Sequence, residues 1–264
     1  MNDDSAPSAP IGVIGGSGFY SLFDDAASVT VDTPYGAPSD AVTVGTLGDR
    51  SVAFLPRHGR GHDLPPHGVN YRANLWALKT LGVGSVVGVN AVGSLSPEVP
   101  AGSLVVPDQL VDRTWGREST YFDGPEVAHA SMADPYCADG RARALEAAAA
   151  WPAVDGGTQV VIQGPRFNTR AESRWYAAGG GTIVGMTACP EVGLARELGL
   201  CYTPLCLVTD MDAGFETGEG VTQEEVFAAF KANVDKLRAV VARLVARLPI
   251  PRACDCASLA PAAV

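Results

Sequence analysis

The sequence predicts an α/β fold: a single domain with a central mixed β-sheet flanked by helices. Short apolar runs typical of buried strands alternate with helical segments for most of the 264 residues, and such alternation is typical of α/β proteins. No internal repeat, linker or break in composition divides the chain. We therefore expect one domain at 10–250, between a disordered N-terminal tail at 1–9 and a flexible C-terminal tail at 251–264.

Composition and charge argue against several classes of protein. Hydrophobic residues make up 47% of the chain, which is ample for a core, and the net charge is −10. Duplex binding depends on clustered Lys and Arg, so no nucleic-acid partner is expected. No apolar run is long enough for a transmembrane helix, so no membrane partner is expected either. The acidic start, MNDDSAPSAP, does not resemble a signal peptide, which favours a cytoplasmic location.

The cysteines follow no metal-binding spacing. There are six, and none of them form a C-x-x-C pair, so no zinc pattern is present and no metal site is expected. Most of the first four, at positions 137, 189, 201 and 206, are expected to be buried thiols. Cys254 and Cys256 lie in a polar tail. They are either a redox-active pair or, as we prefer, a passive pair in a disordered tail.

The first part of the chain contains two turns suited to anions. A buried strand at 11–14 runs into GGSG at 15–18, which lacks the third glycine of a dinucleotide-binding fingerprint. This turn is either a plain tight turn or a phosphate cradle made by backbone N–H groups. A hairpin at 41–55 precedes PRHGRGH at 56–62, which contains no acid. Two Arg and two His there favour an anion-binding turn over a solvated basic loop.

The rest of the chain alternates clear helix and strand patterns. The last helix begins with a capping box of Thr222 and Glu225. The segment 108–136 is irregular, polar and aromatic, and such a segment in a compact domain is often functional. The expected elements are helices at 70–81, at 139–151, at 170–178, from Pro190 and at 222–248, and strands at 85–90, at 103–107, at 158–163, up to Met186 and at 201–209.

Two acids, Asp210 and Asp212, follow the nearly all-apolar strand at 201–209. Ligands of open α/β sheets bind at the carboxyl ends of strands, although Asp also serves simply to cap turns. Other strands end in unusual turns too, namely GGSG, RHGRGH, NAVGS, GPRFN and MTACPE. Gathered at one sheet edge, these turns would form a pocket for an anion at one end and a flat basic group at the other.

Seven motifs, in this order and spacing, resemble those of a known family: GGSGFY, TPYGAPSD, RHGRGH, VNYRANLWALK, GPRF-x-x-RAES, MT-x-x-PE and TDMDAG. Over residues 11–248 the chain resembles the S-methyl-5'-thioadenosine phosphorylase branch of the purine nucleoside phosphorylases. The resemblance implies a phosphorylase/hydrolase-like fold with a partly barrel-like sheet, and a homotrimer with sites near subunit interfaces. It also implies a pentosyltransferase of purine salvage that uses phosphate as co-substrate and needs no cofactor.

The resemblance also implies roles for individual residues. The phosphate site would be Ser17, Arg57, His58, Asn90, Ala91 and Thr187, with Asn90 standing where close homologues commonly have Thr. The nucleoside site would be Phe167 on the purine face, Met186 against the ribose, Asp210 at N7, Asp212 at the 6-amino group, and His129 reaching the 5' end of the sugar from a neighbouring subunit. Gln223, near Val226, stands where methylthio-selective relatives have a small apolar residue. It either faces solvent or points inward, where it would admit a 5'-hydroxyl.

The two acids suggest a mechanism. Burial and a neighbouring acid both raise a carboxyl pKa, so we expect a protonated Asp210 to donate to N7 while Asp212 accepts from the 6-amino group. Relatives specific for 6-oxopurines carry Asn in place of Asp210. The predicted reaction converts S-methyl-5'-thioadenosine and phosphate into adenine and 5-methylthioribose 1-phosphate, with adenosine as a further candidate substrate. Alternatives are a 6-oxopurine nucleoside phosphorylase, a nucleosidase that uses water, a non-catalytic nucleoside-binding protein and a dinucleotide-binding oxidoreductase.

Overall fold

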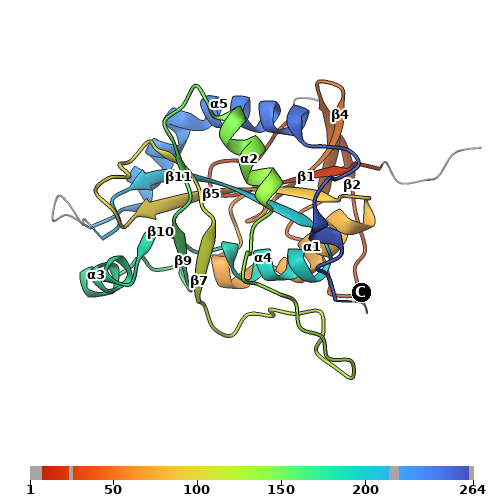
Figure 1. Cartoon of the computed structure of the whole chain (residues 1–264), viewed down its shortest axis with the longest axis horizontal. Coiled ribbons are helices and arrows are strands. Elements are labelled where there is room, and N and C mark those ends of the chain that lie inside the picture. Colours follow the sequence, from red (N-terminus) through yellow and green to blue (C-terminus); the bar gives the residue numbers. More distant parts are fainter. Residues whose placement is uncertain (1–7, 24–25, 214–219, 262–264) are drawn as a thin grey trace, which may run out of the picture.

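A computed structural model of the chain describes residues 8–23, 26–213 and 220–261. The described residues form one 11-stranded mixed sheet with helices on both faces (Figure 1). The single mixed sheet flanked by helices confirms the predicted fold class. Most of the expected N-terminal tail, residues 1–7, lies outside the described residues, but Ala9 is buried and its N–H donates to the carbonyl of Leu81 at 2.9 Å.

The sheet branches at its long central strand. Strand β5 pairs in parallel with β1 and with β11, and its last residues pair antiparallel with β10. The path runs β2-β3-β4-β1-β5-β10-β9-β7, while β11 joins β5 to β6 and β6 pairs with β8. The strands are β1 Ile11–Gly15, β2 Ala27–Val29, β3 Val42–Leu47, β4 Arg50–Pro56, β5 Ser85–Ser94, β6 Leu104–Val106, β7 Gln109–Arg113, β8 Ala153–Asp155, β9 Thr158–Ile162, β10 Gly181–Gly185 and β11 Cys201–Asp210.

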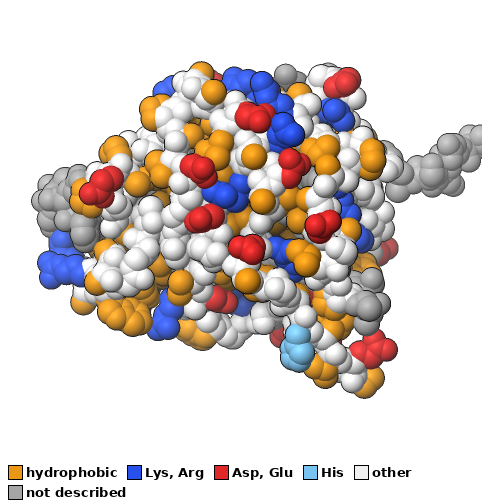
Figure 2. Space-filling model, in the orientation of Figure 1, with side chains coloured by type: hydrophobic (Ala, Val, Ile, Leu, Met, Phe, Trp, Pro, Cys, Tyr) orange, Lys and Arg blue, Asp and Glu red, His pale blue; other side chains and the backbone are white. Residues whose placement is uncertain are grey.

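The helices pack in two layers. In Figure 1, α2 and α5 lie above β5 and β11, and α1 and α4 lie below them. The helices are α1 Tyr71–Thr80, α2 Ala138–Ala147, α3 Arg170–Ala178, α4 Ala188–Glu197 and α5 Gln223–Arg247, with 3-10 turns η1 Pro66–Gly68 and η2 Asp255–Ala257. Figure 2 shows acidic and basic side chains mixed over one face of the molecule. No described helix is long and apolar enough to cross a membrane.

Local signals in the sequence explain how several helices begin. The side chain of Thr222 accepts from the N–H of Glu225, and the Glu225 carboxylate accepts from the N–H of Thr222, which confirms the predicted capping box. A second capping box, of Thr169 and Glu172, begins α3. These caps satisfy N–H groups that the first turn of a helix leaves without intrahelical partners.

Each helical layer buries its own apolar cluster against the sheet. Leu75 and Leu78 of α1 pack with Leu194 of α4 on one face. On the other face, Phe230 and Leu237 of α5 pack with residues of α2. The predicted apolar side of α1 is confirmed for its leucines, whereas Trp76 is only half-buried. Burial of this kind, at about 25 cal/mol per Å² of apolar surface, is what holds the helices on the sheet.

Several segments differ from what the sequence indicated, including the short strands β2 and β8, which were not expected. Strand β7 lies within 108–136, and it was missed because it is half exposed and has no apolar alternation. Strand β5 continues to Ser94 rather than ending at residue 90. Instead of a loose tail, the described residues after α5 pack on the domain. There the Arg252 guanidinium donates from Nη1 to the carbonyls of Gly84 and Gly199 at 3.0 and 2.6 Å, and Cys256 is buried.

Candidate active site

A cavity of about 420 Å³ lies where the turns after several strands converge. Because β4, β1, β5 and β11 run in parallel, their carboxyl ends meet at one edge of the sheet. All but one of the candidate residues line this cavity: Ser17, Arg57, His58, Asn90, Ala91, Phe167, Met186, Thr187, Asp210, Asp212, Gln223 and Val226. The structure therefore brings together residues that lie up to 209 positions apart, from Ser17 to Val226.

His129 is the candidate residue that does not line the cavity. It is exposed, in a stretch after β7 that has no helix or strand. Its expected role is to reach the 5' end of the sugar in a neighbouring subunit. Because a single chain does not test that role, it stays a prediction.

Arg57 is held by an ion pair that the sequence did not reveal. Its Nε and Nη2 donate to the two carboxylate oxygens of Glu191 at 2.6 and 2.7 Å, and its Nη1 donates to the carbonyl of Val89 at 3.0 Å. Both charged side chains are fully buried. Burial alone would lower the pKa of Arg57, but the charge of Glu191 and the hydrogen bonds to it raise that pKa overall. The guanidinium therefore stays charged and in a fixed orientation at the cavity wall.

Glu191 is the functional neighbour that the sequence reasoning missed. The segment around Arg57, residues 56–62, contains no acid, and the carboxylate that pairs with Arg57 comes from 134 residues further along the chain. The Tyr202 hydroxyl also donates to Glu191, at 2.5 Å. The available signal was that Glu191 is the one charged residue of ACPEVGLA at 188–195, because an acid in such an apolar run is rarely buried without a partner.

The GGSG turn comes within contact distance of Arg57. A Cβ atom on Gly16 would lie 2.6 Å from the carbonyl oxygen of Val89 and 2.9 Å from Nη1 of Arg57. Only glycine allows this approach. Gly16 and Ser17 both line the cavity, so this turn forms part of its wall.

His58 faces the cavity as a neutral ring. Its Nδ1 lies 2.8 Å from the carbonyl oxygen of Leu64, which can only accept, so Nδ1 carries the proton and Nε2 is an acceptor. Burial, together with the charge of Arg57, lowers the pKa of His58 to about 4. A second ring, that of His62, lies 4.9 Å from it between centroids and also lines the cavity. His62 was present in the RHGRGH motif but was not selected from the sequence.

Asn90 and Thr187 complete this end of the cavity. The Thr187 hydroxyl donates to Oδ1 of Asn90 at 3.1 Å, and Nδ2 of Asn90 donates to the carbonyl of Gly88 at 3.2 Å. The two side chains come from β5 and from the turn before α4. Hydroxyl, amide and guanidinium donors are thus concentrated at one end of the cavity, as an anion site requires.

The two acids lie at the end of β11 and are held differently. Asp210 accepts from the Thr209 hydroxyl at 2.8 Å and from the N–H of Asp212 at 3.0 Å. Oδ2 of Asp212 accepts from the Asn168 amide at 2.8 Å and from the Ser173 hydroxyl at 2.5 Å. Burial raises the pKa of both carboxyl groups. Asn168 and Ser173, which fix Asp212, were not selected from the sequence either.

The backbone at this end of the cavity is strained. Asp212 and Ala213 have φ values of 31° and 34°, in the left-handed region that disfavours residues with a Cβ. Such strain is found at functional sites, where the surrounding structure enforces it. Residues 214–216, which follow directly, lie outside the described part of the chain.

The remaining lining residues are apolar or lie at the rim. Phe167 and Met186 contribute an aromatic ring and a thioether to the cavity wall. Gln223, Val226 and Phe227 come from the first turns of α5. Gln223 is exposed as a residue and yet lines the cavity, so it lies at its mouth.

Comparisons with known proteins find relatives over nearly the whole chain. The family model described as "Phosphorylase superfamily" matches residues 10–247. A purine nucleoside phosphorylase of Streptomyces coelicolor is 61% identical over 258 residues, covering 94% of this chain and 92% of its own length. An S-methyl-5'-thioadenosine phosphorylase of Mycolicibacterium smegmatis is 56% identical, covering 92% of this chain and 93% of its own.

Solved structures show the same fold. The methylthioadenosine phosphorylase of Schistosoma mansoni in complex with adenine has a TM-score of 0.87 at 40% identity, covering 90% of this chain and 91% of its own. A variant of that protein, described as an adenosine/methylthioadenosine phosphorylase, was solved with methylthioadenosine. The match of nearly the whole chain to the family model shows that this protein belongs to the phosphorylase superfamily.

Proposed function

We propose that this protein catalyses the phosphorolysis of 6-aminopurine nucleosides, with S-methyl-5'-thioadenosine as its principal substrate. Phosphate attacks the anomeric carbon, the bond from that carbon to N9 breaks, and the products are adenine and 5-methylthioribose 1-phosphate. The observation that carries the proposal is a single cavity with a buried cation and neutral donors at one end and two acids, buried Asp212 and half-buried Asp210, at the other. Phosphate is a substrate, so no cofactor is required.

The phosphate would be held by Ser17, Arg57, His58, Asn90, Ala91 and Thr187. Arg57 is held in place by Glu191 before any substrate binds, which limits the reorganisation needed during the reaction. Neutral His58 would accept a hydrogen bond through Nε2 from the one protonated oxygen of hydrogen phosphate, while its Nδ1 stays on Leu64. Holding phosphate beneath the anomeric carbon turns a bimolecular attack into an effectively unimolecular one.

The departing adenine would be received by the two acids. Negative charge develops on the base as the glycosidic bond breaks, and a protonated Asp210 at N7 would relieve it. The raised pKa of Asp210, caused mainly by burial, supports that role. Asp212, oriented by Asn168 and Ser173, would accept from the 6-amino group. Phe167 would pack on the purine and Met186 against the ribose.

The 5' end of the sugar would face the first turns of α5. Val226 and Phe227 offer apolar contact to a methylthio group, and Gln223 at the mouth offers an amide to a hydroxyl. We therefore include adenosine as a second substrate. The Streptomyces coelicolor relative is described only as a purine nucleoside phosphorylase, which does not specify the base. The alternative substrates are therefore 6-oxopurine nucleosides.

We also propose that the protein is a homotrimer that serves purine salvage in the cytoplasm. The exposed His129 would reach the cavity of a neighbouring subunit. Large apolar side chains on the same stretch support an interface there, since Trp115 and Val127 are 72% and 75% exposed in the single chain. Light scattering coupled to gel filtration measures the assembly directly, and a monomer would contradict the trimer.

The deciding experiment measures base release from S-methyl-5'-thioadenosine, adenosine and inosine, each with and without phosphate. Phosphate-dependent release of adenine supports the proposal, and the ratio of kcat/KM for the two adenine nucleosides ranks the 5' pocket. Turnover without phosphate would instead indicate a nucleosidase. Turnover of inosine alone would leave the anion site in place and overturn the roles of the two acids.

A further inference from the structure

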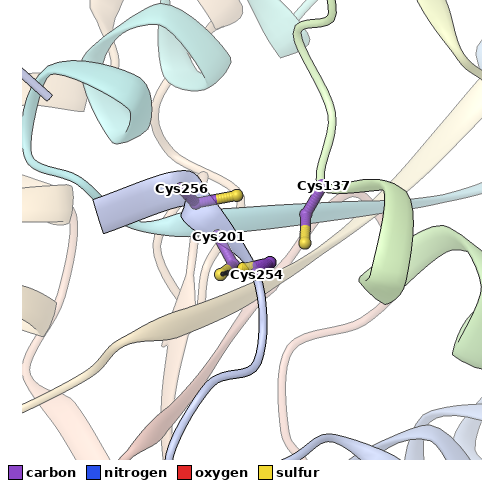
Figure 3. A group of neighbouring side chains, drawn as sticks. All are labelled: Cys137, Cys201, Cys254 and Cys256. Carbon is purple, nitrogen blue, oxygen red and sulfur yellow. Dashed lines mark hydrogen bonds between the residues drawn. The ribbon is translucent and has the colours of Figure 1, made fainter. Parts of the chain in front are cut away.

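Four of the six cysteines come together at one point, far from the cavity described above. Cys137 precedes α2, Cys201 begins β11, and Cys254 and Cys256 lie in the C-terminal segment. Their Sγ atoms all lie within 4.8 Å of one another (Figure 3). Cys201 and Asp210 are at opposite ends of β11, so the length of a strand separates the cluster from the acids.

The distances suit a single metal ion. A tetrahedral zinc site with Zn–S bonds of about 2.3 Å has S–S separations of about 3.8 Å, and four thiolates close a structural site. The four sulfur atoms lie within 4.8 Å of one another, and those of Cys201 and Cys254 are 3.1 Å apart, so small side-chain shifts would bring the set to tetrahedral separations. A small cavity of about 10 Å³ is bordered by three of these cysteines, Cys137, Cys201 and Cys254.

Two of the four sulfur atoms accept hydrogen bonds from groups outside the cluster. The N–H of Gly140 donates to Sγ of Cys137 at 3.4 Å, and Nη1 of Arg252 donates to Sγ of Cys201 at 3.7 Å. Such donors around the ligands are what tune a metal-thiolate site. A zinc ion with four thiolates carries a charge of −2, which the guanidinium of Arg252 offsets in part.

We propose that Cys137, Cys201, Cys254 and Cys256 bind one Zn²⁺ ion as a structural site. Binding releases the four thiol protons and forms four Zn–S bonds, with no change of oxidation state. The ion would join the C-terminal segment to the N-terminus of α2 and to the start of β11. Cys254, the least buried of the four, leaves a route by which the ion enters.

The test measures metal in the full chain, purified under reducing conditions without chelators. Mass spectrometry of the metal content should find one zinc per chain. After removal of the zinc, added Co²⁺ should give the visible absorption of a tetrahedral tetrathiolate site. Cys137→Ser is an informative variant, because Ser keeps the hydrogen bond that caps α2 through Gly140 while removing a strong zinc ligand.

The variants and the wild type give distinguishable outcomes. Loss of zinc in Cys137→Ser and in Cys254→Ser, with zinc retained in the control Cys206→Ala, supports the site. Cys206 is buried in the same strand as Cys201 but is outside the cluster. Zinc that persists in both cluster variants would overturn the proposal. It would also be overturned if the reduced wild-type chain neither contains nor takes up zinc, or if thiol titration finds the four cysteines as disulfides.

Discussion

At the scale of single residues, Asp210 and Asp212 are two acids that the fold holds close together and largely away from water, which disfavours their charged forms. They lie two positions apart, Asp212 buried and Asp210 half-buried, and desolvation of the two carboxyl groups raises both pKa values. Each is nevertheless satisfied by neutral donors: a hydroxyl and a backbone N–H for Asp210, an amide and a hydroxyl for Asp212. Neutral donors hold a carboxyl group in place without the strong lowering of pKa that a cation would cause, which keeps a proton available for a leaving base.

Replacing Asp210 with Asn tests this role. The amide would still accept from the N–H of Asp212 and would donate to the Thr209 hydroxyl. We expect kcat/KM for S-methyl-5'-thioadenosine to fall by about 100-fold, as for loss of a group that stabilises developing charge, and activity on inosine to rise. Loss of adenine activity without any gain on inosine would show that Asp210 does not set base specificity.

The same variant should not lose stability. A folded-state pKa that burial raises above the unfolded value means that ionised Asp210 destabilises the fold as pH rises through that pKa. Asn carries no such charge. The Tm of Asp210→Asn at pH 7 should therefore equal or exceed that of the wild type, and a markedly lower Tm would mean that the carboxylate contributes net stability.

His58 should make the protein sensitive to acid. Its folded pKa of about 4 lies below the ordinary 6.5, so the unfolded state binds more protons between these two values. Stability is complete above pH 6.5 and is lost as pH falls towards 4, by up to about 3 kcal/mol. His58→Asn keeps a donor for Leu64 but cannot titrate. Urea unfolding from pH 7 to 4.5 should show a weaker pH dependence in this variant, whereas parallel curves would contradict the assignment.

At the scale of elements, one buried network ties three of them together. Arg57 follows β4, Glu191 lies in α4, and Tyr202 lies in β11. The ion pair between Arg57 and Glu191 has no exposure to solvent. Because an unpaired buried charge is far more costly than a buried pair, each of these elements is constrained by the other two.

Glu191→Gln should therefore be severely destabilising. It leaves the Arg57 guanidinium buried without a counter-charge, which costs about 3–5 kcal/mol, measured as the free energy of unfolding in urea. The matched control is Glu146→Gln in α2, whose ion pair with Arg143 joins side chains that are 53% and 40% exposed. That change should stay within about 0.5 kcal/mol. Equal effects of the two variants would show that the buried pair is not a structural link.

Gly88 allows β5 to pack directly against Tyr202. A Cβ atom at this position would lie 1.9 Å from the Tyr202 hydroxyl oxygen, which donates to Glu191. Gly88→Ala should cost about 1–3 kcal/mol by overpacking and should lower activity by displacing the network. Gly193→Ala is the control: it lies in α4 with no atom near its Cβ position, and it should be neutral or stabilising by up to about 1 kcal/mol. A stable Gly88→Ala variant would contradict this packing.

At the scale of the whole molecule, the anion end of the cavity draws on turns from across the sheet. Ser17 follows β1, Arg57 follows β4, Asn90 lies in β5 and Thr187 follows β10. A ligand of this site binds the folded state and not the unfolded state, because these groups are far apart in the unfolded chain. Binding should therefore stabilise the entire domain.

Phosphate should raise the Tm of the wild-type protein. At a concentration 100 times its Kd it adds about 2.7 kcal/mol to the free energy of unfolding. Thr187→Val, which removes a hydroxyl at this end of the cavity, should show a smaller shift at the same phosphate concentration. Chloride at matched ionic strength is the control for screening. Equal shifts with chloride and phosphate would mean that no specific anion site is present.

Much of the fold could be predicted from short patterns in the sequence. Hydrophobic periodicity predicted α1, periodicity together with a capping box predicted α5, and apolar runs that end in turns predicted β1, β4, β9 and β11. Strand β7 was not predictable in this way, because its side chains are half exposed and it is defined by pairing with β9. The same holds for the C-terminal segment, whose order depends on contacts with Gly84 and Gly199 rather than on its own composition.

The sequence by itself determined the alternation of strands and helices, the turns that line the cavity and the family to which they belong, because these depend on residues close together in the chain. Only the tertiary structure decided that Arg57 is neutralised by Glu191, that His58 is neutral, and that four cysteines meet at one point. Charge state and ligand geometry depend on burial and on which groups the fold brings into contact, which can be far apart in the chain, as for Arg57 and Glu191, 134 positions apart. Spacing along a chain does not encode such distances.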